Sequence, residues 1–452
     1  MSPPTERIEP RLSAFDASMV VVSLVIGIGI FRTPAIVAAA AGTTERFFAV
    51  WLAGGLISLF GALSYAEIGS RLPRAGGYYR VVAECFHPML AFMLNWAQAL
   101  MQGAGAAGVA FIGSEYLGLL VLAPERRGQA AVLAGAFVLM LVLLALNWAG
   151  IRTGARTQNV LSLLKIGMIL ALATAGLLLH ATPEAAAAPP VEATTTPAFG
   201  LWIIAAAIPA FYSYGGYQNA INLAGDVERP RRGVPLAIIG GMAVVVTLYL
   251  LINLAYERTL GAAGVAKETL VAAAVARAAL GPAGERFVSL AIFLSAAGFV
   301  NATILQMPRS YYAMAEDGAL PRAFLRVNPK TQVQELGLAF FAATMLLPAL
   351  VLGSFEKLLT YVMFTDAVTL AIVASSLFVL RRRKTGQTGG EIFQMPGYPV
   401  LPGIYVLAHL AIAAQIITTE TRMALAGAGI MLAGVPLFMM ARRLSGARDP
   451  RA

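Results

Sequence analysis

The sequence predicts an all-α integral membrane protein of about twelve transmembrane helices, for two reasons. Hydrophobic residues make up 58% of the chain and charged residues only 12%, which is far too apolar for an average soluble domain. Apolar runs of about 20 residues, the length that spans the bilayer core, also follow one another with short polar breaks. The lipid bilayer is therefore the expected surrounding of the chain, and no separate soluble domain fits between the runs.

The apolar runs fall into a group of five and a group of seven. The first five helices are expected near residues 14–40, 46–70, 86–115, 129–149 and 157–179. After a Pro-, Ala- and Thr-rich stretch at 181–200, the others are expected near 201–225, 233–256, 286–315, 335–353, 357–380, 399–419 and 422–441. The segment 257–285 is amphipathic and Ala-rich, so we expect a short surface helix there that acts as an outer lid.

Basic residues indicate which loops are cytoplasmic. With the N-terminus inside, roughly two thirds of all Lys and Arg fall on the cytoplasmic side, as the positive-inside rule expects. The stretch 181–199 has Glu184 and Glu192 but no Lys or Arg, which agrees with an outside location. We therefore expect one transmembrane domain at 14–442, with cytoplasmic tails at 1–13 and 443–452. The expected location is the cell membrane, here a bacterial inner membrane.

The same sequence features disfavour other classes of protein. The net charge of +10 comes from clusters between apolar runs and not from one exposed face, so no nucleic-acid partner is expected. Cys85 is the only cysteine, and His87, His180 and His409 lie far apart in the predicted topology. We therefore expect no metal site and no cofactor. An enzyme is disfavoured, because the chain has no nucleophile motif, phosphate loop or metal signature.

Two of the expected helices are interrupted. Helix 1 contains IGIGIF at 26–31 and then Pro34, and helix 6 contains YSYGGY at 212–217. These helices stand five apart, and Gly- or Pro-interrupted segments at corresponding positions of two halves mark the substrate site of transporters built from inverted repeats. The pattern predicts a repeat 1 at about 14–179, a repeat 2 at about 201–380, and two extra helices at about 399–441.

The broken helices predict the chemistry of the ligand. An unwound helix 1 points free N–H groups and a positive dipole end at the cavity, which suits a carboxylate. An unwound helix 6 frees carbonyl oxygens, which suit an ammonium group or a cation. A zwitterionic amino acid satisfies both. The alternative is that these glycines serve close helix packing, which the matched pair of breaks makes the weaker interpretation.

Polar residues inside the predicted helices add candidates. Lys165 lies deep in helix 5, with Asn159 and Ser162 on the same stripe, and marks either an ion or proton path or a tether for the carbonyls of a broken helix. Asp366 lies in the middle of helix 10, whereas Asp226 is expected to be a structural acid at the cytoplasmic end. Further candidates for the cavity are amides, for which interhelical hydrogen bonding is the alternative: Gln98, Gln102, Gln218, Asn219, Asn222 and Asn301.

Several blocks of the chain, in order and almost from end to end, resemble the amino acid-polyamine-organocation superfamily, within it the L-type amino acid transporters and their bacterial relatives. The resemblance is carried by IGIGIFRTP at 26–34, SYAEIGSRLPRAGGYY at 64–79, NWAGIRTGARTQNVLSLLK at 147–165, YSYGGYQNAINLAGDVERPRRGVPLAI at 212–238, MAEDGALPRAFLRVNP at 314–329, and residues 393–399. It implies the five-plus-five inverted-repeat fold, with helices 1 and 6 unwound at mid-membrane.

The resemblance also implies residue roles. The substrate carboxylate would lie on the helix 1 break at Ile26, Gly27, Ile28 and Gly29, and its amine on helix 6 at Tyr212, Ser213 and Gly215, with Tyr212 at the position of an aromatic gate. Lys165 falls on the helix 5 lysine that, in sodium-independent members, stands where related sodium-coupled carriers bind an ion. Sodium coupling is therefore disfavoured.

Three departures from the family pattern matter. Ile28 replaces the small residue usual between the two glycines, which narrows the pocket. The pair of acids expected after helix 6 is reduced to Gly225-Asp226, which weakens a proton or cation role there. The loop after helix 3, at 116–130, lacks the cysteine that bridges animal members to a glycoprotein, so no covalent ancillary subunit is expected.

The first hypothesis is a sodium-independent amino acid transporter that works by alternating access, either as an exchanger or as a proton symporter, and the sequence does not separate these modes. One alternative is a polyamine or organic-cation carrier of the same fold, which should line its cavity with more acids than Asp366 alone. Another is a membrane sensor that keeps the fold and transports nothing.

Overall fold

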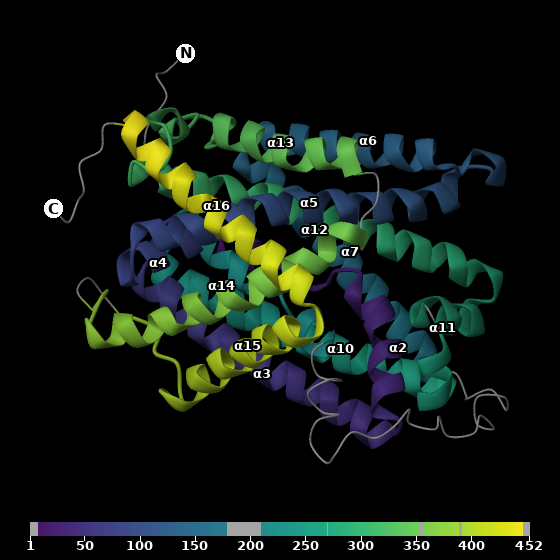
Figure 1. Ribbon diagram of the computed structural model, residues 1–452. Helices are drawn as coiled ribbons and strands as arrows, with labels where there is room; N and C mark the ends of the chain where they lie inside the picture. Colours follow the sequence, from purple (N-terminus) through teal and green to yellow (C-terminus); the bar gives the residue numbers. More distant parts are fainter. Residues whose placement is uncertain (1–7, 179–208, 269, 353–355, 388–390, 446–452) are drawn as a thin grey trace.

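The computed structural model describes residues 8–178, 209–268, 270–352, 356–387 and 391–445, and these are almost entirely helical (Figure 1). The helices before the first gap are α1 (Ala14–Val25), α2 (Gly29–Ala41), α3 (Thr44–Arg71), α4 (Gly77–Cys85), α5 (Pro88–Val121), α6 (Gln129–Trp148) and α7 (Ile151–Leu178). Those after it are α10 (Pro230–Lys267), α11 (Val271–Leu280), α12 (Pro282–Glu316), α13 (Glu335–Leu352), α14 (Glu356–Arg382), α15 (Val400–Thr419) and α16 (Thr421–Ser445). Short 3-10 helices are η1 (Pro124–Arg126), η2 (Tyr217–Leu223) and η3 (Arg322–Leu325).

The described helices confirm the predicted all-α membrane fold. Nine of those in the described ranges are long and apolar enough to cross a bilayer, and the bent pair α1 and α2 makes a tenth span. Helix α13 matches the expected run at 335–353 but is a shorter apolar helix. The expected span 201–225 lies partly outside the described residues, which begin again at 209.

Helices α10 and α12 form the centre of the bundle. In the apolar 18-residue stretch of α12, 78% of the residues are buried, because the helix packs against α5, α7, α13 and α6. Helix α10 packs against α3, α1, α7 and α2. Figure 1 shows α6 and α13 side by side along one edge of the bundle and α3 along the opposite edge. Helix α1 thus lies between the two central helices, whereas α2 packs on α10, α3 and α11 and exposes Ile36.

The segments predicted to be cytoplasmic contact one another at one end of the bundle. Arg71 and Arg381 both donate to Glu67, and Arg231 donates to the Gly386 carbonyl. Arg11 likewise donates to the Lys330 carbonyl. These contacts gather the basic loops on a common side, as the Lys and Arg distribution predicts, without identifying that side as cytoplasmic.

The structure also differs from the predicted elements. Helix α4 was not expected, because a nine-residue amphipathic helix is too short to register as an apolar run. The segment 257–285 does contain a helix, α11, but α10 first continues to Lys267 across a non-helical Gly261. Helix α11 buries Val271, Ala272, Val275 and Ala276, which is the amphipathic face expected from the sequence, and its role as a lid stays a prediction.

Candidate functional site

The predicted break in helix 1 is present, and it leaves backbone donors free. Helix α1 ends at Val25, α2 begins at Gly29, and the two are bent by 47°. The Gly27 N–H donates back to the Val25 carbonyl and the Phe31 N–H to the Ile28 carbonyl. The N–H groups of Ile28, Gly29 and Ile30 have no acceptor in any described part of the chain. They form the unsatisfied N-terminus of α2, which attracts anions.

The carbonyl groups freed by the same break are already bonded to side chains. Lys165 is 1% exposed, and its Nζ donates to the Ile26 carbonyl at 2.7 Å and approaches the Ser23 carbonyl at 3.4 Å. Ser295 Oγ donates to the carbonyls of Ile26 and Gly27 at 3.0 and 3.3 Å. Tyr249 donates its hydroxyl to the Val25 carbonyl at 3.0 Å. Four carbonyl oxygens at the C-terminal end of α1, those of Ser23, Val25, Ile26 and Gly27, therefore accept hydrogen bonds from side chains of the protein.

The stripe predicted around Lys165 lies against α1. Ser162 Oγ donates to the Met19 carbonyl at 2.8 Å, and Asn159 Nδ2 donates to Asp16 Oδ1 at 2.6 Å. A side chain on Gly298 of α12 would place its Cβ 2.8 Å from Ser23 Oγ and 3.2 Å from Lys165 Nζ. The absence of a side chain at Gly298 thus leaves space for the Lys165 amino group.

The predicted break in helix 6 frees acceptors. The chain is helical at 209–213, turns at 214–216 and continues as η2. The Gly215 N–H donates to the Tyr212 carbonyl at 3.0 Å, and Gln218 Oε1 accepts from the Gly216 N–H at 2.8 Å. Within the described ranges, the carbonyl oxygens of Ser213, Tyr214 and Gly215 accept no hydrogen bond.

The two breaks touch through their backbones. Gly216 has φ +123°, and a Cβ there would overlap the Leu24 carbonyl oxygen, so only glycine fits. A Cβ on Gly29 would lie 3.1 Å from Ser213 Oγ. A Cβ on Gly27, by contrast, would meet nothing within 4 Å. Free N–H groups and free carbonyls thus lie on neighbouring segments, with open space beside Gly27.

Other predicted residues are divided between this site and structural networks. Asn301 is fully buried and bonds to Asn147, Gln158 and the Gly154 carbonyl, which joins α6, α7 and α12 and involves neither break. Gln218 acts on the break itself, through the Gly216 N–H. Asp226 forms a two-point ion pair with Arg309, at 3.0 and 3.2 Å, in agreement with the structural role expected for it.

Asp366 on α14 is a half-buried carboxylate that borders the helix 6 region. Gln98 Nε2 donates to its Oδ1 at 2.9 Å. Four tyrosine side chains also lie near the carboxylate: Tyr65, Tyr78, Tyr212 and Tyr217. No described Lys or Arg forms an ion pair with it. Tyr212 therefore lies near an acid with which no described Lys or Arg pairs.

Sequence reasoning missed Ser23, Ser295 and Tyr249, which complete the hydrogen bonding around the helix 1 break. It also missed Gly216, which allows the close approach to the Leu24 carbonyl, and Gly298, which leaves space for the Lys165 side chain. Gly216 stands inside the quoted YGGY motif, so the motif itself was a signal. No pattern in the sequence points to Ser295 or Tyr249, because their partners are backbone carbonyls more than 200 residues away.

The sequence is similar to known proteins over almost its whole length. Residues 12–440 match the family model described as amino acid permease. The chain is 27% identical to the serine/threonine exchanger SteT of Bacillus subtilis, over 95% of this chain and 96% of that protein. It is 25% identical to the human cystine/glutamate transporter, over 96% and 85% of the two chains. It is 24% identical to the human large neutral amino acids transporter small subunit 2, over 96% and 80%.

Proposed function

Since the chain belongs to the amino acid permease family, we propose that it carries an amino acid across the cell membrane by alternating access and without sodium. The observation that supports this proposal best is the contact between two helix breaks of opposite character. One offers free N–H groups and the other free carbonyl oxygens, which is the pair of partners that a zwitterion needs.

The proposed binding mode follows from the free groups. The substrate carboxylate accepts from the N–H groups of Ile28, Gly29 and Ile30, where the dipole of α2 favours negative charge. The ammonium group donates to the carbonyls of Ser213, Tyr214 and Gly215. The substrate backbone then fills the open space beside Gly27, between Ile26 and Ile28, with Tyr212 as the gate.

Sodium independence rests on Lys165. A cation site needs unpaired oxygens, and those at the end of α1 already accept from Lys165, Ser295 and Tyr249. The fixed ammonium supplies the positive charge that a bound ion would bring. If Lys165 stays charged throughout the cycle, the carrier is an exchanger; if it gains and loses a proton, the carrier is a proton symporter.

Asp366 is the observation that favours the second candidate, an organic-cation or polyamine carrier. An acid without a cationic partner in the described chain is costly within a membrane and is expected to serve a function. The N–H groups at α2 favour the amino acid, because a polyamine has no anionic group to accept from them.

Counterflow in proteoliposomes tests the proposal. Purified protein is reconstituted, loaded with unlabelled solute, and supplied with labelled amino acid in sodium or in choline buffer. We expect uptake of at least one α-amino acid at equal rates in the two buffers, with competition by amino acids but not by amines that lack a carboxylate. Uptake of polyamines alone would replace this function with the second candidate, and uptake of neither, from correctly folded protein, would favour the sensor.

A further inference from the structure

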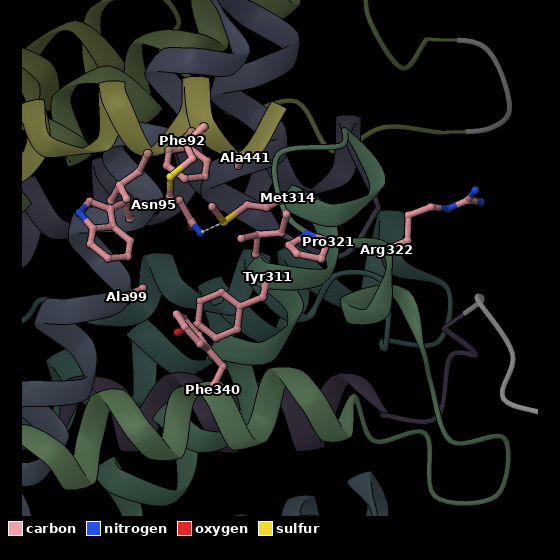
Figure 2. A pocket seen from close by; sticks show the side chains of 13 residues that line it. Phe92, Asn95, Ala99, Tyr311, Met314, Pro321, Arg322, Phe340 and Ala441 are labelled. Carbon is pink, nitrogen blue, oxygen red and sulfur yellow. Dashed lines mark hydrogen bonds between the residues drawn. The ribbon is translucent and has the colours of Figure 1, made fainter. Parts of the chain in front are cut away.

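A separate pocket of about 520 Å³ lies between α5, α12, α13 and α16, beside the loop that carries η3 (Figure 2). None of the residues of the helix breaks lines it. Its walls are aromatic and aliphatic: Phe92, Trp96, Met314, Phe340, Leu437 and Met440. The amide of Asn95 donates to Met314 Sδ at 2.9 Å, so this polar group is already engaged. The lining is therefore mostly apolar and suits a hydrocarbon, and its few polar groups are those of Asn95, Trp96, Tyr311 and Arg322.

The mouth of the pocket faces lipid. Helices α13 and α16 both pack on α5, and both expose large hydrophobic side chains outward. Leu347 on α13 is 59% exposed and Leu432 on α16 is 60% exposed. Met440, which lines the pocket, is itself 56% exposed. In a membrane protein such residues contact acyl chains, so Met440 brings one side of the pocket to the lipid-facing surface of the bundle.

The charge at the rim is positive. Arg322 is the only charged residue among those that line the pocket, and Figure 2 shows its side chain extending outward beyond Pro321. The nearby acids Glu316 and Asp317 both pair with Arg80, and Glu335 accepts from Asn328. Arg322 forms no ion pair within the described ranges. This end of the bundle is also the one that the arginine distribution predicts to be cytoplasmic.

We propose that this pocket binds an acyl chain of an anionic phospholipid from the cytoplasmic leaflet, with the headgroup phosphate at Arg322. Basic residues at the cytoplasmic membrane surface attract anionic headgroups. The apolar walls of the pocket contact the acyl chain in the place of neighbouring lipids. One turn of an α-helix, about 10 Å across and 5.4 Å long, would already fill most of the pocket volume. The pocket therefore admits an acyl chain but not a helix of several turns from another protein.

Photolabelling of the reconstituted full-length protein tests the proposal. Vesicles of phosphatidylcholine receive a trace of phosphatidylglycerol, or of phosphatidylcholine, with a photoactivatable group on one acyl chain. Mass spectrometry then maps the label. We expect the phosphatidylglycerol probe to label peptides containing Trp96 or Met314 in preference to those containing the lipid-facing Leu163 and Leu164 of α7. Equal labelling of both regions by both probes means annular lipid only and overturns the proposal.

Two pairs of variants separate the headgroup contact from the chain contact. Arg322→Gln should reduce labelling of the pocket by phosphatidylglycerol about fivefold, since one Arg near an anionic surface contributes about 1 kcal/mol. Arg326→Gln, on the same loop but outside the pocket lining, should not. Ala441→Trp should fill the pocket and reduce labelling by both probes, whereas Leu432→Trp on the outer face of α16 should not.

The outcomes distinguish a bound lipid from general attraction of lipids to the basic surface and from binding of free phosphate at Arg322. An equal loss in Arg322→Gln and Arg326→Gln shows general surface attraction and overturns the proposal, as does full labelling of folded Ala441→Trp. An excess of inorganic phosphate should leave the label in place, because one exposed Arg binds free phosphate only weakly, whereas the membrane already holds the lipid phosphate beside Arg322. If phosphate displaces the probe, the site is an anion site and the proposed lipid is wrong.

Discussion

Lys165 is an ionisable side chain buried beside the helix 1 break, and its contacts explain how it is tolerated there. A central Lys costs about 2.5–3.5 kcal/mol on insertion scales, so it must be offset by polar partners. Its Nζ lies within hydrogen-bonding distance of Ser23 and of the Ile26 carbonyl, and Gly298 leaves room for it. At the scale of a single residue, the lysine holds the broken helix through these hydrogen bonds, and its role as a substitute for a bound cation stays a prediction.

We predict that Lys165→Ala lowers transport about tenfold or more, because a hydrogen bond to a charged group contributes about 1.5–3 kcal/mol and the freed carbonyls lose it. Initial uptake rates in proteoliposomes measure the effect. Lys267→Ala, an exposed lysine at the end of α10, is the matched control and should transport normally. A Lys165→Ala protein with wild-type rates would show that the ammonium has no role in the cycle.

Gly27 gives a sharper test of the substrate position than Gly29. A side chain at Gly29 meets Ser213, so its replacement perturbs packing, whereas a Cβ at Gly27 meets nothing within 4 Å. We therefore predict that Gly27→Val folds normally but loses substrate-induced thermal stabilisation, because the valine occupies the space meant for the ligand. Gly240→Val, which also has open space but lies exposed on α10, should keep that stabilisation. Retained stabilisation in Gly27→Val would move the substrate elsewhere.

At the scale of elements, a buried charge cluster joins α3 to α14 at the basic end. Glu67 is fully buried and accepts from Arg71 at 2.8 Å and from Arg381 at 2.6 Å. It also accepts the backbone N–H of Met395 at 2.8 Å, in the segment between α14 and α15. One carboxylate thus joins α3 to the end of α14 and to the segment that follows α14, which are more than 300 residues away in the sequence.

We predict that Glu67→Gln destabilises the protein by about 3–5 kcal/mol, because removal of one partner leaves buried charge uncompensated. Thermal unfolding in detergent, followed by tryptophan fluorescence, should show a clearly lower Tm. Glu285→Gln breaks the pair with Arg277, in which both side chains are more than 60% exposed, and should leave the Tm close to that of the wild type. Similar small shifts in both variants would mean that the cluster does not hold the closed end.

At the scale of the whole molecule, the sequence predicted what depends on local pattern. Apolar runs predicted the spans, and glycine pairs predicted both breaks, because an interrupted helix is visible along the chain. The partners of distant segments were not predictable. Asn301 forms the interhelical hydrogen bonds that were the alternative to a place in the cavity, but the sequence did not identify α6 and α7 as its partners, and no pattern marks the partner of Ser295. The division into two repeats stays a prediction.

Orientation in the membrane is the whole-molecule property that the basic loops predict and that can be measured directly. In a Cys85→Ser background, single cysteines are placed at Gln387, after the basic end of α14, and at Glu125 in η1; both positions are exposed in the structure. Positive loops stay in the cytoplasm, so in intact cells Gln387→Cys should resist an impermeant maleimide and Glu125→Cys should react. Permeabilised cells, in which both should react, are the control. The reverse pattern in intact cells would invert the topology, and it would also place the pocket at Arg322 in the outer leaflet.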